Sequence, residues 1–403
     1  MNRGLEVFVP KTQVGSMESQ LFDDLQTTLK TAGAVPAIDQ LCQELRARKD
    51  YTGLFYAMLM KKRHELGVSP VPTGPSQDLP KDLHGAYEDA IREAGRTVGR
   101  LFLEDKNIPG AWSFYRMLGE PEPVAAALDS TQLSPDEDCQ PIIEIAFHQG
   151  VNPRKGFDWI LEKYGICSAI TIMGGGEGPH GQDVRHYCIK KLVRALHEEL
   201  LARLRAEIEH KQGFAPTAKT VPEMIAGRDW LFSDDFYHID VSHLSAVTQM
   251  ALQLDSCAEV QLARELCAYG KKLSPRFQYQ ADPPFDNHYV DYDIYLGILC
   301  SDHVEEGLAH FRQKAEKAAA EELGTFPAEV LVNLLMRIGQ PREALQVARK
   351  YLASVEEGRL SCPGIVELCR INNDYATLAE VAREQGNAVN FMAGLIAAGN
   401  GKK

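Results

Sequence analysis

Apolar residues recur at three- and four-residue spacing along most of the chain, which is the pattern of amphipathic α-helices. The first part predicts helices at 17–32, 36–48 and 51–65, with Gly33 and Gly67 as helix ends. The longest stripe lies between 183 and 212 and consists of Ile189, Leu192, Val193, Leu196, Leu200, Leu204 and Ile208. The best candidate for a strand is Cys167–Met173, a short apolar run that a helix would also accommodate. The pattern therefore predicts an all-α fold with little or no β-sheet.

Short turns divide many of these helices into pairs. One pair is predicted at 112–130, with its turn at Gly119–Pro121, and another at 141–164. A third pair lies at 330–352, where an apolar helix, Gly339 and Pro341 precede a second helix with Ala344, Leu345 and Ala348. A shift of the sequence by 33 residues places Leu345 on Leu378, and a shift of 37 in the other direction places it on Leu308.

This spacing of the last helical hairpins, about 34 residues, resembles that of tetratricopeptide repeats. The resemblance covers 296–383 best and is degenerate, since most of the family's consensus tryptophan and tyrosine positions are missing. It implies an α-solenoid of stacked hairpins, in which each hairpin buries its apolar face against its neighbours. The predicted organisation is N-terminal helices at 1–66, a Pro-rich linker or loop at 67–82, a hairpin array at 83–275 with a Gly-rich loop at 174–182, an aromatic and acidic insertion at 276–295, and C-terminal repeats at 296–403.

Composition and charge exclude some classes of function. The formal net charge of −13 repels phosphate backbones, which argues against nucleic-acid binding. No run of 18 apolar residues is present, so a membrane-spanning protein is not expected. The nine cysteines are odd in number and form no C-x-x-C pair, a usage typical of free thiols in the reducing cytoplasm.

The segment MGGGEGPHGQDVRHYC (173–188) gathers glycines, histidines and a cysteine. It lacks the lysine and hydroxyl of a phosphate-binding loop, and its spacing matches no compact zinc motif. We interpret it as a loop before the longest helix, with Asp183 as the N-cap of that helix. Such a loop can close over a groove that other residues form.

The densest cluster of possible metal ligands and acid/base groups lies between 234 and 243. Its members are Asp234, Asp235, Tyr237, His238, Asp240 and His243. A bend near Asp240 would let His238, Asp240 and His243 hold a divalent metal such as zinc. The same residues fit helix ends equally well, with Ser233 and Ser242 as N-caps and the aspartates in a first turn.

The insertion FQYQADPPFDNHYVDYD (277–293) alternates aromatic and acidic residues. Asp286, His288, Tyr289 and Asp291 are its candidate binding residues, because aromatic and acidic side chains together bind peptides and cations. Alternatively, the rings pin the loop to the array.

These features support two hypotheses on function. The first is a cytoplasmic scaffold, without a cofactor, that binds a protein or peptide in the concave groove of the array; the acidic balance favours a basic partner. The alternative is a metal-dependent hydrolase centred on His238, Asp240 and His243, completed by His288 or Asp291, in which the metal activates water. The alternative requires the clusters at 234–243 and 286–293 to meet in one pocket.

Overall fold

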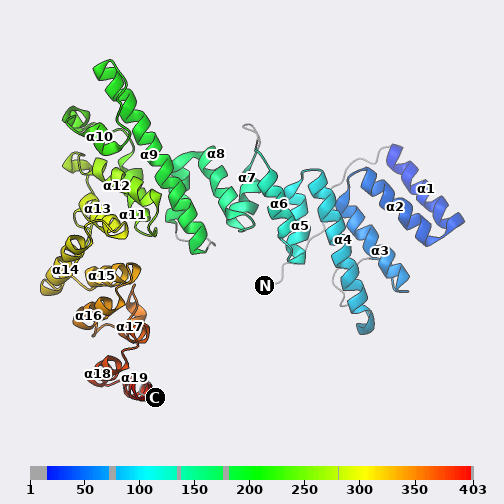
Figure 1. Cartoon of the computed structure of the whole chain (residues 1–403). Helices are drawn as coiled ribbons and strands as arrows, with labels where there is room; N and C mark the ends of the chain where they lie inside the picture. The colour runs from blue at the N-terminus through cyan, green and yellow to red at the C-terminus, as the bar shows by residue number, and fades with distance from the viewer. Residues whose placement is uncertain (1–15, 72–78, 134–137, 176–180, 280, 401–403) are drawn as a thin grey trace. The chain divides into compact units, whose positions relative to one another are not determined.

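The structure, a computed structural model, describes residues 16–71, 79–133, 138–175, 181–279 and 281–400. All regular secondary structure in these ranges is helical, and no strand occurs in them (Figure 1), which confirms the all-α prediction. The strand candidate Cys167–Met173 lies inside a helix, α8 (Pro153–Gly174). The chain divides into two compact units, residues 1–156 and 157–403, which are described separately below.

The first unit is an array of antiparallel helices, with main contacts between helices that follow one another in the sequence. Its elements are α1 (Ser16–Ala32), α2 (Ala34–Ala47), α3 (Tyr51–Glu65), the 3-10 turn η2 (Lys81–Leu83), α4 (His84–Glu104), α5 (Ile108–Leu118), α6 (Glu122–Ser130), α7 (Gln140–Ile143) and the π-helical turn η3 (Glu144–His148). The three helices predicted in the first part of the sequence are α1, α2 and α3, and the hairpin predicted at 112–130 is α5 and α6. Of the predicted Pro-rich linker, residues 72–78 lie outside the described part of the chain.

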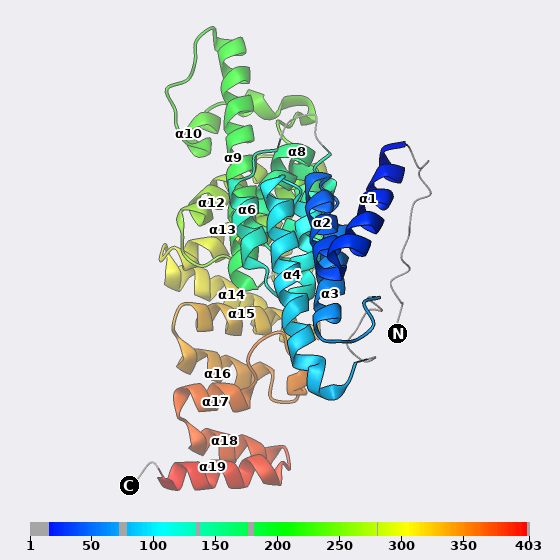
Figure 2. The same cartoon turned by 90° about the vertical axis from the view of Figure 1, so that its right-hand side faces the viewer.

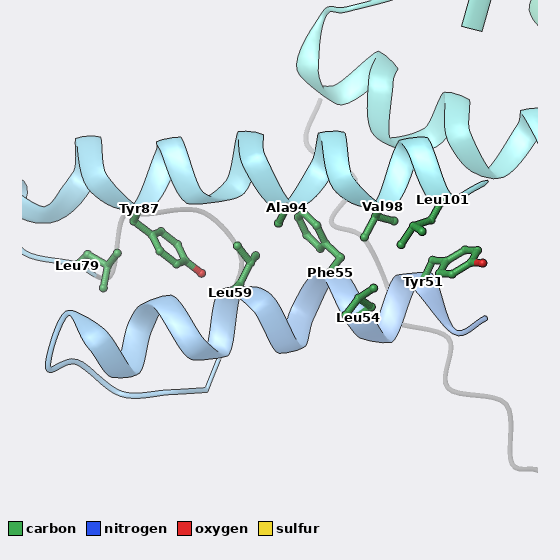
Figure 3. Close-up of a cluster of buried hydrophobic side chains, with 9 residues drawn as sticks. All are labelled: Tyr51, Leu54, Phe55, Leu59, Leu79, Tyr87, Ala94, Val98 and Leu101. Carbon is green, nitrogen blue, oxygen red and sulfur yellow. The ribbon is translucent and has the colours of Figure 1, made fainter. Parts of the chain in front are cut away.

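One hydrophobic core cluster of the first unit lies between α3 and α4, where the apolar faces of the two helices meet (Figure 3). The buried cluster consists of Tyr51, Leu54, Phe55, Leu59, Leu79, Tyr87, Ala94, Val98 and Leu101. Leu79 shows that the end of the predicted linker is part of this core. Each large apolar side chain buried here stabilises the unit by about 1.5–3 kcal/mol relative to an exposed one.

The second unit continues the all-helical order. It contains the rest of α8, α9 (Gln182–Gln212), α10 (Val221–Ile225), η4 (Asp229–Asp235), α11 (Val241–Ala251), α12 (Ala258–Gly270), η5 (Pro275–Phe277), α13 (His288–Leu299), α14 (Val304–Ala320), α15 (Phe326–Arg337), α16 (Pro341–Tyr351), η6 (Glu357–Arg359), α17 (Ile365–Asn372), α18 (Tyr375–Glu384) and α19 (Ala388–Asn400). From α11 onward each α-helix packs against the next, and Figure 2 shows the later ones one below another. No described helix in either unit is long and apolar enough to cross a membrane.

Helix α9 is the long helix that the apolar stripe predicts. All seven residues of the stripe are completely buried, because α11 and α12 pack against this face. The helix begins at Gln182 with Gly181 as its N-cap, so Asp183 lies in the first turn and the prediction of Asp183 as the cap is wrong. The helix runs without a break to Gln212 since no glycine or proline occurs between these ends. Residues 176–180 of the predicted Gly-rich loop lie outside the described residues.

The hairpin predicted at 330–352 is formed by α15 and α16. Gly339 lies in the turn with φ of 75°, a conformation that favours glycine, and Pro341 occupies the first turn of α16. Leu345 on α16, Leu378 on α18 and Leu308 on α14 are all buried, so the positions matched by the sequence shifts lie on the second helices of successive hairpins.

The predicted insertion at 276–295 is only partly an irregular segment. Its second half is the beginning of α13, which starts at His288 and packs against α12 and α14. Tyr289, Tyr292 and Leu296 follow the three- and four-residue spacing of a helix and face the core. The sequence pattern does not predict this helix, because Pro283 and Pro284 indicate irregular structure for the whole stretch.

Candidate functional site

The acidic residues of the first predicted cluster serve as helix ends and ion-pair partners. Asp240 is the N-cap of α11 and accepts hydrogen bonds from the backbone N–H of Ser242 (2.8 Å) and of His243 (3.3 Å). The pKa of Asp240 is lowered, first by the hydrogen bond from the Ser242 hydroxyl and then by those from the two backbone N–H groups. The predicted cap, Ser242, is therefore inside the helix, and its hydroxyl supports the actual cap.

Asp234 and Asp235 lie at the end of η4, both with a positive φ, at 55° and 58°. Asp235 accepts a hydrogen bond from Arg276 Nη1 (2.8 Å), and Asp234 is exposed. The pKa of Asp235 is lowered first by a hydrogen bond from Ser274 and then by Arg276. These contacts tie η4 to the segment after α12.

His238 is buried, with only 5% of the residue exposed. Its backbone N–H and its ring nitrogen Nδ1 lie 2.7 Å and 3.1 Å from the hydroxyl of Tyr269 on α12. The rings of Phe232 and Phe236 lie edge-on to the imidazole. Burial lowers the pKa of His238, so the imidazole is neutral near pH 7, and burial raises the pKa of Tyr269 to about 12. His238 is a core histidine of this unit.

Tyr237, the aromatic member of the first cluster, is 46% exposed and lies edge-on to Phe277 (5.1 Å between ring centroids). It joins the short turns η4 and η5. Together with Asp235 and Arg276, this ring contact fixes two irregular segments against each other.

The aromatic members of the second cluster are buried at the start of α13. His288 Nε2 lies 3.1 Å from the hydroxyl of Ser245 on α11, and the Tyr292 ring lies 4.1 Å from the His288 ring. Burial lowers the pKa of His288 to about 4. Tyr289 packs on Gly270 of α12, where an added Cβ would lie 2.5 Å from the ring.

Asp291 is completely buried and is held by three donors. Its carboxylate accepts from His310 Nε2 (2.7 Å), from Lys314 Nζ (2.8 Å) and from the backbone N–H of Asn287 (2.7 Å). Lys314 also pairs with Asp286. Asp286 and Asp291 therefore bind α14 to the N-terminus of α13, which is a structural use of both carboxylates.

The two predicted clusters are neighbours across α11, α12 and α13, but they do not form one acid/base or metal pocket. His238 and Tyr289 contact successive residues of α12, Tyr269 and Gly270. The acidic residues of the two clusters have other partners: Asp240 caps α11, Asp235 pairs with Arg276, and Asp286 and Asp291 pair with Lys314. Within the described ranges, no group of three or more His, Cys, Asp or Glu side chains is arranged to hold a metal ion, and this holds for His238, Asp240 and His243 as they lie in this structure.

A polar cavity of about 320 Å³ lies beside this region. Its lining residues come from α12, α13, α14 and the turn before α14: Arg264, Asp293, Ile294, Gly297, Asp302, His303, Glu306, Gly307 and His310. Arg264 bridges Asp293 (2.8 Å) and Asp302 (2.9 Å), and His310 is bound to Asp291. The charges of this cavity are largely paired with one another, which leaves little for a ligand to bind.

A groove of the opposite character lies in the first unit, between α1 and α3 and above α2. Its volume is about 360 Å³, and it is lined by Leu25, Gln26, Leu29, Ala34, Ala37, Ile38, Leu41, Met60, His64 and Pro70. No lysine, arginine, aspartate or glutamate is among these residues. The rim residue Leu29 is 53% exposed. Phe22, two helical turns earlier on the same face of α1, is 63% exposed.

The sequence pattern does not predict this groove. Leu25, Leu29, Ile38 and Leu41 belong to regular helical stripes, and such stripes predict a buried face. Among the described helices, α1 makes its extensive contacts with α2, and Leu29 of its stripe stays half exposed.

Comparisons of this chain with protein-family models, with curated proteins and with solved structures found no match. The class of protein is therefore defined by the structure alone: an all-α protein whose consecutive helices pack in sequence order within two units.

Proposed function

We propose that the chain is a helical-repeat scaffold that binds a segment of a partner protein, and that the groove between α1 and α3 is its binding surface. The observation that carries this proposal is the lining of the groove, which is almost entirely apolar and open to solvent. Apolar grooves of this size bind hydrophobic side chains. Binding is favourable by about 25 cal/mol for each Å² of apolar surface that it removes from water.

The shape of the groove favours an amphipathic helix as the partner. Helices α1 and α3 run in the same direction with α2 antiparallel between them, and a partner helix fills the trough that they leave with residues at i, i+3 and i+7. Phe22, Leu25 and Leu29 follow the same spacing along the rim helix α1. Each apolar anchor of the partner would thus meet an apolar side chain.

Electrostatic attraction acts over a longer range than the apolar contacts in the groove. The lining residues include no lysine, arginine, aspartate or glutamate, whereas the whole chain has a formal net charge of −13. A partner with basic residues flanking its apolar anchors would be attracted by this field and would bind faster at low ionic strength. The preference for a basic partner is therefore part of the proposal.

Two further observations support the proposal. The last hairpins resemble tetratricopeptide repeats, a repeat class that presents extended binding surfaces. None of the nine cysteines, all of which lie in the described ranges, forms a disulfide, which suits the reducing cytoplasm that we propose as the location of the protein.

The proposal is tested by selecting displayed amphipathic helical peptides on the wild-type protein and measuring their affinity by fluorescence anisotropy. We expect the selected peptides to carry apolar residues at i, i+3 and i+7, and to bind Leu29→Glu at least about ten-fold more weakly, a loss of about 1.4 kcal/mol. Met117→Glu is the matched control, because Met117 is 54% exposed on α5, in the same unit but outside the groove. Selected peptides that bind Leu29→Glu as tightly as wild type would refute the proposal, as would a selection that enriches none.

A further inference from the structure

Helix α19 presents an unpartnered apolar face. Val389, Met392, Leu395 and Ile396 are 79%, 52%, 49% and 59% exposed, although all four are large apolar residues. Side chains of this kind in one contiguous group indicate an interaction site, because their exposure to water is unfavourable.

Packing against α18 fixes which face of α19 is exposed. Gly394 is buried against α18, where an added Cβ would lie 2.9 Å from the backbone N of Ala379. With about 100° of rotation per residue, Val389, Met392 and Ile396 lie on the side of α19 opposite Gly394. Their spacing is i, i+3 and i+7.

The helix is also uncharged. Residues 388–400 contain no lysine, arginine, aspartate or glutamate, in a chain whose formal net charge is −13. Two copies of so acidic a chain repel each other over most of their surfaces, and they approach most easily where both surfaces lack charge. The face of α19 and the groove between α1 and α3 are two such surfaces.

We infer that α19 of one copy occupies the α1–α3 groove of a second copy. This inference rests on the proposed function of the groove as a binding surface, names its partner as another copy of the same chain, and replaces the basic partner proposed above by an uncharged helix. The match is chemical and geometric: the groove suits an uncharged helix with apolar anchors at i, i+3 and i+7, and Val389, Met392 and Ile396 provide them. Because the groove and the helix are different surfaces, the interface is heterologous, so the copies assemble head to tail.

The test is a complementation experiment on the full chain, with Met392→Glu and Leu29→Glu. Both side chains are about half exposed, so neither substitution buries a charge, and unchanged circular dichroism verifies folding. Met392→Glu removes the docking helix and keeps the groove. Leu29→Glu removes the groove and keeps the helix.

Sedimentation velocity then separates the outcomes. We expect the average mass of the wild type to rise with concentration, each variant alone to remain a monomer, and their equimolar mixture to form a species of two chains that grows no further. A wild type that stays monomeric overturns the inference. A dimer of Leu29→Glu alone, with Met392→Glu monomeric, also overturns it, because it shows symmetric pairing of two α19 helices.

This test is independent of the peptide selection. If selected peptides bind the groove while the wild type stays monomeric, the groove keeps its proposed function and only α19 is excluded as its occupant. If the complementation succeeds and Leu29→Glu still binds every selected peptide normally, the groove is a self-assembly site and the scaffold proposal fails.

Discussion

Asp291 provides the strongest test of how the second unit is held together. Replacement by alanine leaves Lys314, His310 and the Asn287 N–H without their shared acceptor. The loss of one partner from a buried ion pair costs about 3–5 kcal/mol, because the remaining charge stays partly desolvated. Lys314 retains Asp286, so we expect Asp291→Ala to destabilise the α13–α14 hairpin by about 3 kcal/mol, at the lower end of that range.

Two control variants separate the buried charge from its surroundings. Asp286→Ala removes the other carboxylate that pairs with Lys314. The Asp286 side chain is 52% exposed, so this change is expected to cost less than about 1 kcal/mol. Asp291→Asn keeps an acceptor oxygen of the same shape without the charge and is expected to cost about 2 kcal/mol.

The assay is hydrogen exchange of backbone amides in residues 288–320, read against urea concentration, since it reports the opening of this hairpin rather than of the whole chain. The expected order of stability is wild type, Asp286→Ala, Asp291→Asn, Asp291→Ala. If Asp291→Ala opens no more readily than Asp286→Ala, Asp291 does not hold α13 to α14 and the reasoning is refuted.

Two further predictions concern contacts between helices of the second unit. Burial lowers the pKa of His288 from 6.5 to about 4, so the unfolded chain binds the proton more readily than the folded chain. The stability that is present above pH 6.5 is therefore lost as the pH falls toward 4, by up to about 1.4 kcal/mol per pH unit. We expect the urea midpoint to fall between pH 7 and pH 5, and His288→Gln to reduce this fall. An equal fall in the variant would exclude His288 as a source. The pKa of the buried His238 is also lowered, so this residue contributes to the fall in the same direction. Arg337 on α15 donates to the backbone carbonyls of Leu252 and Leu254 after α11. We expect Arg337→Ala to cost about 2 kcal/mol and Arg337→Lys about half of that, because lysine lacks the planar fork; faster amide exchange in residues 241–254 checks this, and equal exchange in both variants would show that the fork is irrelevant.

The helices could be predicted because their causes are local. The stripe of α9 needs only a run of good helix formers with apolar residues at regular spacing, and the turn at Gly339 needs only a residue that tolerates positive φ. Helix α13 is not predicted for a local reason too, because the preceding prolines outweigh a helical pattern that starts at His288, four residues after Pro284.

The roles of the candidate site residues could not be predicted, because their partners come from distant parts of the chain. Asp240 caps its own helix, at an end where the sequence predicted Ser242 as the cap. Asp291 has the same residue type and a similar acidic neighbourhood, yet its partners His310 and Lys314 lie on α14. His238 likewise meets Tyr269 across 31 positions of the sequence. A cluster of ligand-type residues in the sequence therefore does not distinguish a metal site from a set of tertiary contacts.

Apolar surfaces raise a different difficulty. An amphipathic helix has a polar side that predicts which face water will cover, but α19 is apolar on nearly every side, and such a helix is expected to be buried all round. Among the described helices of the second unit, only α18 makes extensive contact with α19. The composition of α19 therefore predicts burial, whereas several of its large apolar side chains are exposed. The disagreement is resolved if its burial is completed by another chain, and the same reasoning applies to the open groove beside Leu29. Partner surfaces of this kind are found by comparing what the sequence expects to be buried with what the fold leaves exposed.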